Sequence, residues 1–128
     1  MLYEILDELK NTIITNISEI KTCKIGLESG ISASDVPFVR VIPVEDNVDE
    51  RMQLNITVDV VVGTLQLSDL EETYKKHLTI KDKLIKILDE YQLELAGVVY
   101  TGGVYDSDEV ENFKISILRF ELTGVELW

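Results

Sequence analysis

The stretch "QLNITVDVVVGTL", Gln53 to Leu65, alternates apolar and polar side chains along most of its length. The residues on its apolar parity are Leu54, Ile56, Val58, Val60 and Val62. The polar residues on the other parity are Asn55, Thr57 and Asp59. A period of two residues indicates a β-strand, and a strand with one wet face is typical of an antiparallel sheet. The stretch therefore predicts one long antiparallel strand.

Two amphipathic helices are predicted, one on either side of this strand. In "LYEILDELKNTIITNISEIK", residues recur at intervals of three and four on an apolar stripe of Leu2, Ile5, Leu6, Leu9, Ile13, Ile17 and Ile20. In "LSDLEETYKKHLTIKDKLIKILDEY", the stripe is Leu70, Tyr74, Leu78, Leu84, Ile87, Leu88 and Tyr91. Such stripes indicate helices that bury one face. The first helix is expected to end near Ile20, and Ser68 with Glu71 has the capping-box spacing for the start of the second.

Other apolar runs predict further strands. Pro37 and Pro43 cannot donate to a sheet ladder, so Phe38 to Ile42 is expected at a sheet edge, and the acidic "EDNVDERM" after it as an exposed loop. "TCKIGLESG" is compatible with a short strand, and "LELAGVVYTGGV" and "NFKISILRFELTGVEL" are two β runs. The last run has apolar residues on both parities, first Phe113, Ile115 and Ile117 and then Leu118, Phe120 and Leu122. A bulge or burial of both faces explains this, and we expect helices on one face and another subunit on the other.

The element order predicts an α+β fold, a mainly antiparallel sheet with two amphipathic helices packed on one face. The 128 residues fit a single domain, 1–128, and the content of 45% hydrophobic and 28% charged residues is that of a globular protein. The start "MLYEILDELK" lacks the features of a signal peptide, and no apolar run is long enough to span a membrane, so we expect an intracellular protein.

The charge is strongly negative, with 24 acidic and 12 basic residues and a formal net charge of −12. Non-specific nucleic-acid binding depends on lysine and arginine that neutralise phosphates, so this class of function is disfavoured, and so is binding to anionic membranes. The single cysteine, Cys23, excludes an intramolecular disulfide and a multi-cysteine zinc site.

The acidic stretch "YDSDEVEN", Tyr105 to Asn112, was compared with a calcium-binding loop. Counted from Asp106, an EF-hand loop needs a ligand at the fifth position, glycine at the sixth and glutamate at the twelfth. These positions hold Val110, Glu111 and Ile117, so the pattern fails and a solvated hairpin tip is favoured. Other neighbouring carboxylates are interpreted in the same way, as solvated loops.

No catalytic, metal-binding or cofactor-binding residues are assigned. A nucleophilic site needs a nucleophile, a base and an orienting group that converge, and His77, the only histidine, has no evident partners in the sequence. We expect His77 at the surface or boundary of its helix and Cys23 as a buried structural thiol. The "TGG" at Thr101 to Gly103 lacks the length and the lysine of a P-loop.

The second predicted helix carries a lysine-rich segment, "KKHLTIKDKLIK", with Lys75, Lys76, Lys81, Lys83 and Lys86. Its charge is opposite to that of the acidic loops, which would suit head-to-tail association of identical subunits. An ordinary solvated helix face is the equally favoured alternative.

As a whole, the chain resembles the tail terminator, or tail completion, proteins of long-tailed bacteriophages. The resemblance is one of length and element order, through "LYEILDELKNTI", "PFVRVIP", "LNITVDVVVGT", "DLEETYKKHLTIKDKLIKIL" and "VVYTGGVYDSDEVENFKISILRFELTG". It implies a subunit of a ring, commonly a homo-hexamer, that caps the tail tube, stops its polymerisation and joins the tail to the head. It also implies no enzymatic activity and no cofactor, with location in the virion tail or neck after assembly in the host cytoplasm.

The implied partners are further copies of the chain, the tail tube protein and a head or neck connector protein, while DNA passes through without specific binding. Candidate ring-surface loops are Glu45, Asp46, Asp49, Glu50 and Arg51, together with Asp106, Asp108, Glu109 and Glu111. Candidate electrostatic partners are Lys75, Lys76 and Lys83. Two alternatives stay open: a neck connector or head completion protein of the same kind of particle, and a small ligand-binding or enzymatic α+β domain.

Overall fold

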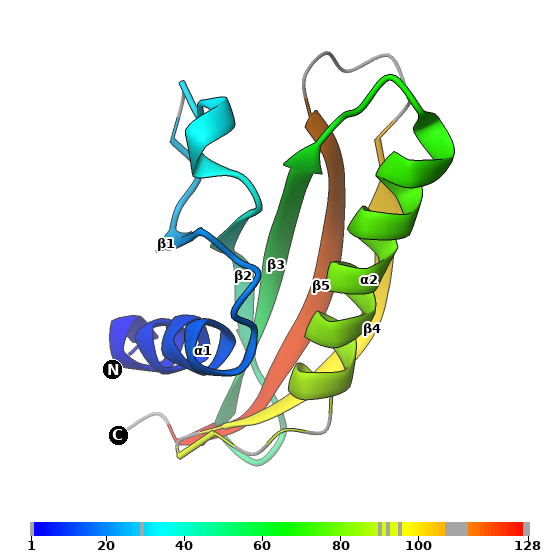
Figure 1. The fold of residues 1–128 in the computed structure, drawn as a ribbon. Helices are drawn as coiled ribbons and strands as arrows, with labels where there is room; N and C mark the ends of the chain where they lie inside the picture. The colour runs from blue at the N-terminus through cyan, green and yellow to red at the C-terminus, as the bar shows by residue number, and fades with distance from the viewer. Residues whose placement is uncertain are drawn as a thin grey trace.

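The computed structural model describes residues 2–28, 30–89, 91, 93–94, 96–106 and 113–126. In these residues the elements are α1 (Leu2–Asn16), β1 (Thr22–Ile25), a 3-10 turn η1 (Ala33–Asp35), β2 (Phe38–Val48), β3 (Gln53–Leu65), α2 (Leu70–Leu88), β4 (Gly97–Tyr105) and β5 (Phe113–Glu126). Figure 1 shows both helices on one face of the sheet, with α1 lying across the strands and α2 running beside β5 and β4. The predicted α+β fold with both helices on one face is confirmed.

Among the described residues the sheet has the strand order β1-β2-β3-β5-β4. β1 pairs in parallel with β2, and the other neighbours are antiparallel. The long alternating stretch is β3, which lies between β2 and β5, with Val60 opposite Val41 on one side and Leu118 on the other. A strand paired on both sides has its backbone groups satisfied by the ladder, which suits the middle of a sheet.

One parity of the strands faces the helices and forms the main core. Its strand residues are Val39, Val41, Ile56, Val58, Val60, Val62, Val98, Leu118, Phe120, Leu122 and Val125. α1 contributes Ile5, Leu6, Leu9 and Ile13, and Ile17 follows just after its end. α2 contributes Ile80, Leu84 and Leu88. The predicted apolar parity of β3 is therefore confirmed, because it is the parity on which the helices pack.

The end of α1 and the start of α2 both differ from the prediction. α1 ends at Asn16, four residues early, although Ile17 stays buried and its N–H donates to the Ile13 carbonyl. At α2 the N-cap is Asp69 and not Ser68, because the Asp69 carboxylate accepts from the backbone N–H groups of Glu71 and Glu72 at 3.0 and 3.3 Å. A carboxylate also interacts favourably with the helix dipole at this end.

The prediction for the proline-bounded strand was wrong in two respects. β2 is not an edge strand over its first residues, because Phe38 to Val41 pair with both β1 and β3. It also continues through Pro43 to Val48, so that half of the expected acidic loop is strand. Pro43 is tolerated because β1 has already ended there, which leaves no ladder partner on that side for the missing N–H, and the register with β3 shifts just after it.

The face of the sheet turned away from the helices has its own apolar cluster at one end. Phe38, Val36 and Val61 are buried there, with Ile31, Ile42, Phe113, Ile115 and Ile117 packed around them. The Phe38 ring lies directly on Gly63, where a Cβ atom would come within 2.0 Å of the ring, and it meets Phe113 edge-on at 6.0 Å. The prediction that both faces are partly buried is confirmed.

Candidate functional site

The acidic β2–β3 hairpin is a defined turn. The Asp49 carboxylate accepts from the N–H groups of Arg51 and Gln53 at 2.8 and 3.0 Å, and the Met52 N–H donates to the Asp49 carbonyl. These bonds, that of Gln53 first, lower the pKa of Asp49. Met52 has a φ of 62°, an αL conformation that closes the turn. The hairpin is therefore held in one shape by its own hydrogen bonds.

The outer half of this hairpin exposes apolar as well as acidic side chains. Glu45, Asp46, Glu50 and Arg51 are exposed, as predicted for this acidic stretch. Three apolar side chains lie among them, with exposed fractions of 45% for Val44, 49% for Val48 and 57% for Met52. An exposed strand end with this mixture is a candidate contact surface.

The lysines of α2 do not form one basic patch. Lys83 is paired with Glu19, which follows α1, and the ammonium group of Lys81 lies 4.3 Å from the centre of the Tyr105 ring. Lys75 and Lys76 are exposed and have no ion pair within the described part of the chain. Of the three predicted electrostatic partners, only Lys75 and Lys76 are therefore left uncompensated.

Lys75 and Lys76 line a groove of about 500 Å³ between α2 and the segment that leads into β2. The apolar part of its lining is Ala33, Val36, Pro37, Leu65, Leu67 and Ile80. Its polar part is Glu19, Thr64, Glu72, Lys75, Lys76 and Thr79. The Leu67 backbone N–H donates to Thr73 Oγ1 at 2.9 Å, which fixes this wall to α2.

Asp106 was predicted at a ring surface, but it is an internal partner instead. Only 12% of its side chain is exposed, and its Oδ1 lies 2.8 Å from Nζ of the fully buried Lys114. Its Oδ2 accepts from the Ile115 N–H at 3.0 Å. Lys114 Nζ also lies 4.5 Å from the centre of the Tyr74 ring on α2. The other predicted residues of this stretch, Asp108, Glu109 and Glu111, lie outside the described residues.

His77 was predicted at the surface or boundary of its helix, and this was wrong, because it is fully buried between α2 and the sheet. Its Nδ1 lies 2.8 Å from Thr64 Oγ1, and its Nε2 lies 2.7 Å from Ser116 Oγ. Burial, and then the positive charge of Lys114, lower the pKa of His77 to about 4. The imidazole is therefore neutral at pH 7, so one hydroxyl donates to it and the other accepts from it.

The order Ser116, His77, Thr64 matches that of a nucleophile, a base and an orienting group, but the arrangement is not accessible to a substrate. Ser116 is 1% exposed and His77 is 0% exposed. The groove reaches Thr64 but neither of the other two. A threonine hydroxyl also carries no charge with which to stabilise an imidazolium, unlike the carboxylate of a catalytic triad. We interpret these three residues as a structural network.

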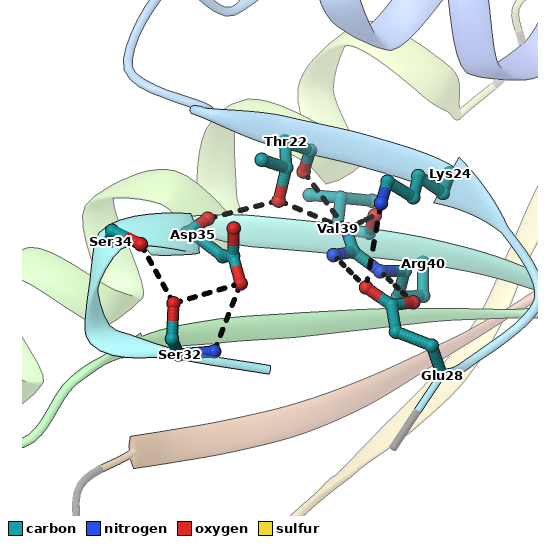
Figure 2. A network of polar contacts seen from close by, with 8 residues as sticks. All are labelled: Thr22, Lys24, Glu28, Ser32, Ser34, Asp35, Val39 and Arg40. Carbon is teal, nitrogen blue, oxygen red and sulfur yellow. Dashed lines mark hydrogen bonds and ion pairs between the residues drawn. The ribbon is translucent and has the colours of Figure 1, made fainter. Parts of the chain in front are cut away.

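Arg40 is a second buried polar group that the sequence did not reveal (Figure 2). Its Nε and Nη2 donate to the two carboxylate oxygens of Glu28 at 2.9 and 2.7 Å. Its Nη1 donates to the carbonyls of Thr22 and Val39 and to the Thr22 hydroxyl. The guanidinium group lowers the pKa of Glu28 to about 2. Arg40 thereby fastens the segment after β1 onto the sheet.

Cys23 packs against the main core and is partly buried, and burial raises the pKa of its thiol to about 11. Such a thiol is protonated at neutral pH and is a poor nucleophile. Within the described residues no three histidine, cysteine or carboxylate side chains gather as metal ligands. In the same part of the chain, neither helix combines the length and apolarity that a membrane span needs.

The exposed features described above are the end of the β2–β3 hairpin and the groove beside α2. Comparisons with protein-family models and with curated proteins give no match to this chain.

Proposed function

We propose that this chain is a structural subunit of a phage particle, a tail terminator that assembles into a ring, commonly of six copies. In this role it caps the tail tube, stops tube polymerisation and joins the tail to the neck of the head. The resemblance in length and element order to such proteins is one support for the proposal. The second support, and the observation that carries it, is the polarity of the sheet.

At the end of the sheet under the first half of α2, the usual polarity is inverted. The strand side chains that face the helix are polar, namely Thr64, Lys114 and Ser116. Those on the opposite parity are apolar, namely Val61, Ile115 and Ile117. Val61 is buried in a cluster with Val36, whereas Ile115 and Ile117 stay partly exposed and belong to that cluster and not to the core under α1 and α2. Apolar side chains that stay partly exposed on the outer face favour contact with another chain. This supports a subunit whose sheet is covered in an assembly.

The charge supports the same role. A ring at the end of a tail tube surrounds the path of the genome, and a net charge of −12 disfavours binding of phosphates to its surface. The described residues with exposed carboxylates include Glu45, Asp46 and Glu50 on one hairpin. Specific DNA recognition is not part of the proposal.

The test is the mass of the purified protein, measured by light scattering at several concentrations, alone and with tail tube protein. We expect a discrete oligomer, and electron microscopy should show rings with a central hole. A strict monomer under all these conditions would contradict the proposal. Binding to heads instead of tube ends would reassign the subunit to the neck connector class.

A further inference from the structure

We propose that the acidic β2–β3 hairpin of one copy docks into the groove beside α2 of the next copy, where its carboxylates meet Lys75 and Lys76. This inference rests on the self-association in the proposed function and specifies the contact that makes it. The hairpin surface is defined as residues 44–52 and the groove by its lining between α2 and η1.

The groove has the character of a receptor site. Its volume of about 500 Å³ falls within the range of about 300–1,000 Å³ that is typical of binding sites. Its lining includes Val36, Pro37 and Leu65, which offer apolar contact. Lys75 and Lys76 add two positive charges that no described carboxylate pairs with.

The hairpin has the complementary character. Between residues 44 and 52 the sequence carries Glu45, Asp46, Asp49 and Glu50 against the single Arg51. The same segment exposes Val44, Val48 and Met52, which can fill apolar space in a partner. Because the hydrogen bonds of Asp49 already fix the turn, docking costs little conformational entropy.

The two surfaces lie at opposite ends of the sheet. Val48 pairs with Leu54 at the hairpin end, whereas Phe38 pairs with Gly63 at the end that adjoins the groove. In Figure 1 the hairpin is at the bottom, and η1 and the start of α2 are at the top. A contact between two different surfaces of identical subunits is heterologous, and it repeats around a closed ring when the rotation between subunits closes.

Charge favours a second copy as the occupant. A chain with a net charge of −12 repels its own copies over most of its surface. Glu19 and Glu72 also line the groove, but Glu19 is paired with Lys83, so the two lysines outnumber the one carboxylate left there. An acidic hairpin of the same chain therefore meets less repulsion at the groove than over most of the surface. The occupants that would contradict the inference are tail tube protein and a small molecule.

Disulfide trapping tests the contact. In a Cys23→Ser background, a Val48→Cys chain and a Lys76→Cys chain of different mass are mixed under mild oxidation. We expect a mixed disulfide between them. The matched control pairs the Val48→Cys chain with an Asn11→Cys chain, because Asn11 is exposed on α1 and does not line the groove.

The native mass of the same samples separates the two possible failures. An oligomer that gives no 48–76 disulfide, or gives it no faster than the Asn11→Cys control, would overturn the docking and leave the ring intact. A monomer at every concentration, with and without tube protein, would overturn both proposals. A 48–76 disulfide that far exceeds the control in an oligomer supports both the docking and self-association.

Charge reversal tests the electrostatic part of the inference. Lys75→Glu with Lys76→Glu should weaken self-association at least about tenfold, a change typical of a lost charge contact. Glu45→Lys with Glu50→Lys in the same chain should restore it. Lys86→Glu is the control, since Lys86 is exposed on α2 but does not line the groove. An equal loss with Lys86→Glu, or no rescue, would overturn the assignment of these partners. Weaker binding of tube protein with unchanged self-association would also overturn it.

Discussion

The two halves of α2 rest on the sheet in different ways. The second half is dry, because Leu84 and Leu88 belong to the main core with Val98, Phe120 and Leu122. The first half is polar, because it places His77 against two hydroxyl groups and Tyr74 against a buried ammonium group. One helix is therefore held by apolar burial at one end and by directed bonds at the other.

This difference explains why apolar side chains lie on the outer face at one end of the sheet. Along β5 the parity toward α2 stays the same, but its residues change from Lys114 and Ser116 to Leu118, Phe120 and Leu122. At the polar end the apolar residues Ile115 and Ile117 are therefore on the other face. The polar half keeps the helix in one position because its buried polar groups have partners, while the outer face carries the apolar side chains.

The largest effect is expected when the buried ion pair is broken. Asp106→Asn keeps an oxygen for the Ile115 N–H but removes the negative charge that lies 2.8 Å from the buried ammonium group of Lys114. We expect a loss of about 3 kcal/mol in the free energy of unfolding, at the low end for buried pairs because the Tyr74 ring remains. Denaturant titration measures it.

Lys114→Met is the matched variant, since it removes the buried charge and keeps an unbranched side chain. It should lose less stability than Asp106→Asn, because the Asp106 carboxylate keeps the bond from the Ile115 N–H and is 12% exposed, whereas the Lys114 side chain is fully buried. If both variants lost the same free energy of unfolding, the ion pair would not be the feature that distinguishes the polar half of α2 from its apolar half.

The next largest effect is on the pH dependence of stability. His77 has a folded pKa of about 4, below its usual 6.5, so the unfolded chain binds a proton before the folded chain does. Stability should therefore fall as the pH drops from about 6.5 to about 4, by up to about 3 kcal/mol, and His77 should contribute nothing above that window. Chemical denaturation at a series of pH values measures this.

A variant without the imidazole supplies the control for carboxylates, which titrate in the lower part of the same window. Since His77 is the only histidine, subtracting the pH profile of such a variant isolates its contribution. If the stability of the two chains changed in parallel between pH 6.5 and 4, the imidazole of His77 would be hydrated in the folded protein and not shielded from water.

A smaller effect is expected on the outer face. Gly63→Ala places a Cβ atom within 2.0 Å of the Phe38 ring, which must move and disturb its contact with Phe113. Overpacking of this kind costs about 1–3 kcal/mol in the free energy of unfolding. Phe38→Leu in the Gly63→Ala chain should recover part of the loss, and purely additive losses would refute the close packing of the outer face.

The smallest effect is expected when the polar side chains under the first half of α2 are all replaced by apolar ones. His77→Leu, Thr64→Val and Ser116→Ala together remove all members of the network, so that no hydroxyl is left unpaired. We expect a change within about 1 kcal/mol, whereas His77→Leu alone should lose more because it strands two hydroxyls. If the triple variant were less stable than His77→Leu alone, the hydrogen bonds of the network would stabilise the fold by more than the cost of leaving their partners unpaired. Thermal unfolding of both chains decides this.

Periodic signals predicted β3 and α1 well but the buried face of α2 only in part, because Leu70 and Tyr91 of its predicted stripe are exposed while Thr73, His77 and Ile80 are buried. The alternation of Leu54 to Val62 and the stripe from Ile5 to Ile13 depend on neighbours a few positions away, so their buried faces were predicted correctly. β2 was harder, because its acidic end has no apolar alternation and remains a strand through pairing with β3, as at Glu45 opposite Thr57. The exposed hairpin residues were named correctly, although as a loop.

The buried polar residues were missed because their partners are remote. Ser116 lies 39 positions from His77, and Glu28 lies 12 positions before Arg40. The available signals were weak: a lone arginine within "VPFVRVIP" and a polar Ser116 within an apolar run. Asp106 was assigned to the surface for the same reason, since its charge was visible in the sequence and its pairing with Lys114 was not.

Patterns in the sequence were enough to predict the α+β class, the position of β3 and the helices, and the acidic charge of the chain. The folded chain was needed to learn which polar groups are inside, which lysines have no ion pair among the described residues and which apolar side chains face outward. The physical reason is that periodicity is a local property of the backbone, whereas the free energy of burying a polar group depends on the partner that the fold brings to it.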